Sequence, residues 1–102
     1  MILPEAELVA AVTRDRAAGK RVGFVAVTFE LLRVGDVRNI QAAAALADRL
    51  VVAVTDGATA AVMTAADRAE LVDSLRGVDY VIVCPAGRVK TLAALLTPDV
   101  RP

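Results

Sequence analysis

The chain has 102 residues, and its 12 basic and 12 acidic side chains cancel to a formal net charge of zero. It contains no histidine and a single cysteine, Cys84, which excludes an imidazole base, a disulfide framework and a thiolate zinc cluster. The balanced charge argues against a nucleic-acid surface, which needs an excess of basic residues. We therefore expect one small domain with no metal site and no nucleic-acid partner.

The N-terminus turns acidic at Glu5 and lacks the basic region and long apolar core of a signal peptide. The longest apolar stretches, residues 22–29 and 51–54, are far shorter than the roughly 20 residues that span a bilayer. We expect a cytoplasmic protein without membrane contact, in which Cys84 is reduced and packs as a small buried residue.

Helical periodicity and short runs of β-branched residues alternate along the chain. The pattern predicts a helix over residues 5–18, a strand over 21–28, a helix over 37–47, a strand over 49–55, a helix between Thr64 and Gly77, a strand over 80–83, and a helix from Val89 that stops before Thr97. We expect Asp36 to be the N-cap of the second helix. The alternation is typical of an α/β, Rossmann-like three-layer sandwich around a short parallel sheet.

Two stretches, residues 29–37 (FELLRVGDV) and 48–54 (DRLVVAV), resemble the HxGH nucleotidyltransferase (cytidylyltransferase-like) superfamily. They are most similar to the adenylyltransferase domain of heptose-phosphate processing enzymes. The resemblance runs without a gap from about Gly19 to Thr55 and continues to residues 95–100 (LLTPDV). It implies strand order 3-2-1-4-5 in the parent fold, and therefore order 3-2-1 here with possibly a partial fourth strand.

In such enzymes the two motif histidines bind the nucleotide phosphates and stabilise the charge that develops there. Arg33 and Asp36 replace them here. Arg33 can still hold a phosphate as a bidentate donor, whereas Asp36 puts a carboxylate at a helix N-terminus, where the phosphate should bind. Val27 replaces a turn glycine, and Glu30 lengthens the family's aspartate. These departures predict that no residue is catalytic.

The resemblance leaves two candidate groups of binding residues. The remnant nucleotide-binding set is Thr28, Phe29, Glu30, Arg33, Gly35 and Asp36, and a possible ligand loop contains Thr55, Asp56, Gly57 and Arg68. The loop residues can equally form an ordinary turn, and Arg68 can equally be a solvent-facing helix residue. Lys20 and Arg21 are expected to be solvated at the entry to the first strand.

The family continues past the position of Pro102 into two more strands and a Ser/Thr-rich motif that complete the nucleotide pocket. Without them, residues 21–28 become an apolar sheet edge whose N–H and C=O groups are unpaired, which is a liability. We expect a second copy of the chain, a partner protein or the terminal segments to cover this edge.

Two functions follow from these features. The first is a nucleotidyltransferase-like domain that is catalytically inactive, needs no cofactor and acts as an oligomeric binding or assembly module. The alternative is nucleotide binding, or cytidylyl or adenylyl transfer to a sugar or polyol phosphate, in which Arg33 and Lys20 hold a magnesium nucleotide and a partner chain completes the pocket. A receiver-like signalling domain fits less well, because no acidic pair follows the first strand.

Overall fold

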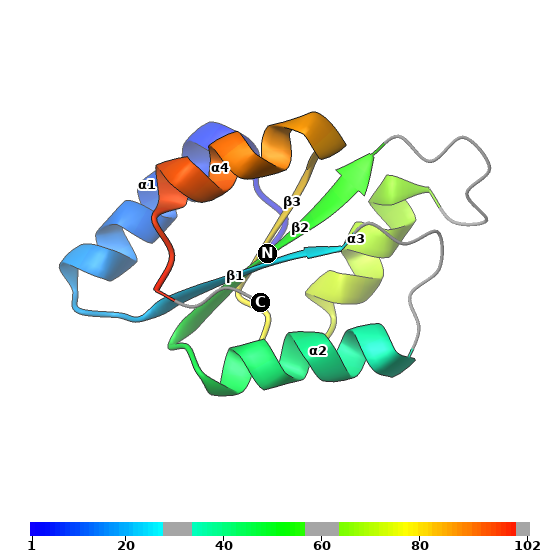
Figure 1. The fold of residues 1–102 in the computed structure, drawn as a ribbon, viewed down its shortest axis with the longest axis horizontal. Coiled ribbons are helices and arrows are strands. Elements are labelled where there is room, and N and C mark those ends of the chain that lie inside the picture. The colour runs from blue at the N-terminus through cyan, green and yellow to red at the C-terminus, as the bar shows by residue number, and fades with distance from the viewer. Residues whose placement is uncertain (28–33, 57–63, 100–102) are drawn as a thin grey trace.

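The computed structural model describes residues 1–27, 34–56 and 64–99, whose helices and strands alternate (Figure 1). In chain order the elements are α1 (Glu5–Ala17), β1 (Val22–Val27), α2 (Val34–Ala45), β2 (Arg49–Asp56), α3 (Ala65–Asp73), β3 (Tyr80–Pro85), the 3-10 turn η1 (Ala86–Arg88) and α4 (Val89–Leu96). The predicted succession is confirmed, with ends displaced by a few residues. No helix within the described segments is both long and apolar enough to cross a membrane.

The three strands form a parallel sheet in the order β1-β2-β3, which confirms the predicted order. Helices α1 and α4 cover one face of the sheet, and α2 and α3 cover the other (Figure 1). Strands enclosed on both faces have little contact with water, and this is why their sequences are almost continuously apolar.

Alternate residues of each strand supply two separate hydrophobic clusters. The cluster under α1 and α4 contains Leu8, Val12, Val22, Phe24, Val51, Ala53, Ile82, Cys84, Leu92, Ala93 and Leu96. The cluster under α2 and α3 contains Val25, Val27, Ile40, Leu50, Val52, Val54, Ala69, Val72 and Val81. The sheet is therefore the middle layer of the predicted sandwich.

The start of α2 differs from the prediction. The helix begins at Val34, so Asp36 lies inside its first turn and is not the N-cap. The reason is that Gly35 is tolerated within the first turn, while an acidic side chain is favoured by the helix dipole both at the N-cap and within the first turn.

Both ends of the α3 segment follow the sequence signals. The backbone N–H of Asp67 donates to Thr64 Oγ1 over 3.0 Å, so Thr64 is the N-cap of the helix predicted to start there. Gly77 has φ +91°, and a Cβ there would lie 2.9 Å from the Cβ of Ala44 on α2. A glycine at this turn therefore allows both the left-handed backbone and close packing against α2.

The N-terminal segment lies along the outer edge of β3. The N–H of Val81 donates to the carbonyl of Met1 over 2.8 Å, and the N–H of Leu3 donates to the carbonyl of Val81 over 2.9 Å. This short parallel bridge was not predicted, because three residues before a helix carry no periodic signal.

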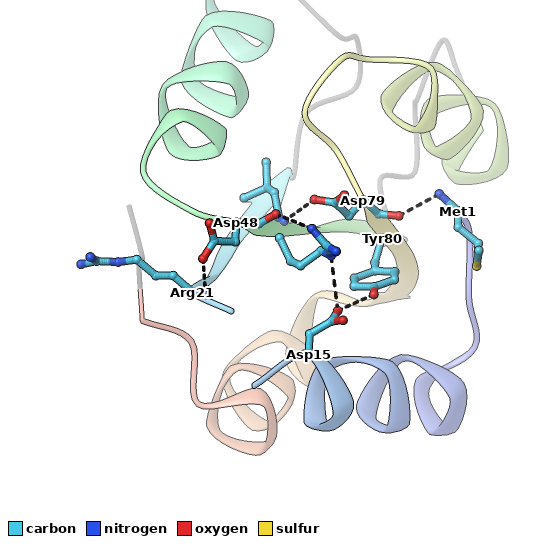
Figure 2. Close-up of polar contacts among 8 residues, drawn as sticks. Met1, Asp15, Arg21, Asp48, Asp79 and Tyr80 are labelled. Carbon is cyan, nitrogen blue, oxygen red and sulfur yellow. Dashed lines mark hydrogen bonds and ion pairs between the residues drawn. The ribbon is translucent and has the colours of Figure 1, made fainter. Parts of the chain in front are cut away.

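An aspartate is joined to a neighbouring strand by the same pair of bonds at three places, and Figure 2 shows the carboxylate bonds of Asp48 and Asp79. In each case the aspartate N–H donates to one residue's carbonyl, and its carboxylate accepts from that residue's N–H. The pairs are Asp48 with Arg21, Asp79 with Leu50 and Asp99 with Val22, at N···O distances of 2.7–3.1 Å. We call this arrangement the aspartate clamp.

Tyr80 and Asp15 join α1 to the amino end of the sheet (Figure 2). The Tyr80 hydroxyl donates to Asp15 Oδ2, and Arg49 Nε lies 3.8 Å from the same oxygen. Burial, and then the bond to Asp15, raise the pKa of Tyr80 above its ordinary value.

We expect a spectrophotometric titration of Tyr80, the only tyrosine, to have its midpoint above the ordinary value of about 10. Because the pKa of Tyr80 is higher in the folded than in the unfolded protein, the protonated hydroxyl contributes to the stability of the fold. This contribution is complete below pH 10 and is lost as the pH rises through the folded-state pKa. Asp15→Asn should lower the midpoint only in part, because burial is the larger cause. A wild-type midpoint equal to that of the urea-unfolded chain would contradict the described contact.

Candidate functional site at the carboxyl edge of the sheet

The carboxyl ends of β1 and β2 lie at the same edge, which is where parallel α/β sheets bind ligands. Thr55, near the end of β2, is 6% exposed, and its Oγ1 donates to the carbonyl of Val27 at the end of β1 over 3.2 Å. The Thr55 hydroxyl therefore joins the two strand ends.

Arg68 extends from α3 toward this edge. Its Nη2 donates to the carbonyl of Thr55 over 2.8 Å, and the residue is only 2% exposed. The solvent-facing alternative for Arg68 is therefore wrong. A buried guanidinium requires polar partners, and the periodic pattern of α3 could not reveal that the carbonyl of Thr55 is one of them.

Asp36 is the acidic residue of the first turn of α2, and it is 8% exposed. Neither Asp36 nor Arg68 is without a partner in the protein. Gly35 precedes Asp36 on an exposed part of the helix, where an added Cβ would meet no neighbour. A buried carboxylate is thus fixed near the start of α2.

The other predicted site residues lie outside the described part of the chain. They are Thr28, Phe29, Glu30, Arg33 and Gly57, together with the side chain of Asp56, whose backbone ends β2. Of the two predicted groups, the structure therefore places Gly35, Asp36, Thr55 and Arg68.

Lys20 lies at the opposite end of the sheet. It precedes β1 and is exposed, as is Arg21, in agreement with their predicted role at the strand entry. Together with Arg16, Gly19 and Asp99 they line a surface hollow of 460 Å³. A strand of six residues separates the two edges, or about 20 Å, so Lys20 lies far from Thr55 and Arg68 of the same chain.

Cys84 is buried on β3, in register with Thr55. Burial raises the pKa of its thiol, and the charge of Glu5 adds to the effect. The thiol therefore stays protonated at neutral pH, and Cys84 acts as the small packing residue that the sequence predicts.

The chain is similar to curated proteins over nearly all of its length, although no family model matches it. It is 35% identical over 107 residues to the bifunctional protein HldE of Gluconacetobacter diazotrophicus, covering 97% of this chain and 22% of that protein. It is 37% identical over 98 residues to HldE of Halorhodospira halophila, covering 96% and 18%. The chain thus spans about a fifth of the length of the curated relatives it matches.

A solved structure shares the fold. The lipopolysaccharide core biosynthesis protein from Thermoplasma volcanium superposes with a TM-score of 0.71 over 81% of this chain and 73% of that one, at 24% identity. This similarity agrees with the parallel order β1-β2-β3 and the two helical layers. The resemblance carried by residues 29–37 and 48–54 is therefore confirmed, and the chain is a nucleotidyltransferase-like domain related to HldE.

Proposed function

We propose that this domain has no nucleotidyltransferase activity and acts as a binding or assembly module within an oligomer. The observation that carries the proposal is the position of Asp36, an acidic side chain 8% exposed in the first turn of α2. A helix N-terminus attracts an anion, and here the protein's own carboxylate supplies it. A phosphate brought to this helix end would meet that carboxylate as a like charge, which disfavours its binding.

The partners of Arg68 support the same proposal. Its guanidinium is the buried cation on α3, and it bonds to the carbonyl of Thr55. A phosphate ligand would have to compete with that bond in a site from which water is largely excluded. Arg68 therefore stabilises the edge of the sheet in preference to holding a nucleotide.

The alternative is nucleotide binding, or transfer of an adenylyl or cytidylyl group to a sugar or polyol phosphate, with Arg33 and Lys20 holding the phosphates and a partner chain completing the pocket. Arg33 immediately precedes α2 in the sequence. Two cations at one edge would have stabilised a triphosphate better than one, because each guanidinium or ammonium offsets part of its charge. Lys20 of the same chain lies at the amino end of the sheet, so a single copy does not bring it to the carboxyl edge, which counts against the alternative.

Calorimetric titration with ATP and CTP, each with magnesium, tests the proposal. We expect the wild type to bind neither nucleotide below millimolar concentration. Asp36→Asn removes the repelling charge and should raise the affinity at least tenfold, which corresponds to about 1.4 kcal/mol. Asp67→Asn, at an exposed first-turn position of α3, is the matched control and should leave the titration unchanged.

Submillimolar binding to the wild type, or release of pyrophosphate when a sugar phosphate is added, would overturn the proposal. An equal gain in Asp36→Asn and Asp67→Asn would show that overall charge, and not the carboxylate at the start of α2, opposes the nucleotide. Circular dichroism should confirm that both variants are folded.

The assembly role is proposed for the outer edge of β1. This strand pairs with β2 on one side, and Asp99 bonds to Val22 on the other; an apolar strand edge that a partner can reach favours association. A second copy or a partner protein that covers it would give this domain a function that needs no catalytic residue.

A further inference from the structure

We draw no further inference here: the strongest candidate, the outer edge of β1 beyond the aspartate clamp that joins Asp99 to Val22, belongs to the assembly role already proposed, and nothing in the described part of the chain shows what covers it.

Discussion

Replacing Leu92 with alanine is expected to lower the free energy of unfolding by about 3 kcal/mol, within the range for buried leucines. Leu92 is 0% exposed on α4 and belongs to the cluster that α1 and α4 form against the sheet. The substitution removes apolar contacts with both layers and leaves a cavity, because the flanking strands pair on the backbone and cannot collapse inward. Urea unfolding followed by far-UV circular dichroism measures the change.

Leu95→Ala is the matched control for this prediction. Leu95 is on the same helix but is 52% exposed, so the helix propensity changes equally while little packing is lost. Its effect should stay within about 0.5 kcal/mol. Equal losses in the two variants would contradict the orientation of α4 against the sheet.

Arg68→Ala is expected to destabilise the protein by about 3 kcal/mol, because it leaves the buried carbonyl of Thr55 without its charged donor and opens a cavity. Arg38→Ala, on an exposed part of α2, should change the stability by less than about 0.5 kcal/mol. Chemical denaturation of both variants provides the comparison.

Arg68→Met separates the contribution of the hydrogen-bonded charge from that of side-chain packing, since methionine keeps much of the volume of arginine and removes its charge. If the guanidinium bonds matter, Arg68→Met should lose stability as well. A variant as stable as the wild type would mean that Arg68 contributes by packing alone, as replacement of a buried ionic group by an apolar one sometimes shows.

The succession of helices and strands was predictable because each element buries a continuous face, and burial dictates the apolar period along the chain. Buried strands such as 51–54 are unbroken apolar runs in the sequence. A strand that is apolar on both faces is covered on both faces, so the sheet could be predicted to lie between two helical layers. The Thr64 cap was predictable for a similar reason, since a cap satisfies a donor only three residues away.

The site was predictable only in part, because its contacts join residues distant in sequence. The bond from Arg68 to Thr55 crosses from α3 back to β2, and nothing in the period of α3 distinguishes a buried arginine from an exposed one. Asp36 was correctly expected near the start of the second helix, but it lies in the first turn of α2 and not at the N-cap. Helix ends shift by a turn at little energetic difference when several residues can serve as the cap.

The aspartate clamps were predictable from the position of the aspartates in the sequence, which an analysis of hydrophobic periodicity does not consider. Asp48, Asp79 and Asp99 each stand directly before an apolar residue or strand. A search for a recurring acidic residue at strand entries would have found all three, and a carboxylate there satisfies a neighbouring N–H that would otherwise face solvent at the end of the sheet.

The bridge between the N-terminal segment and β3 has a consequence for folding during synthesis. The terminal ammonium donates to the carbonyl of Asp79, a contact between residues 78 positions apart. During synthesis residues 1–3 therefore cannot dock until β3 has been made. Contacts of such separation close late and slow the search for the native state, so the ordering of residues 1–3 is expected to be among the last events of folding.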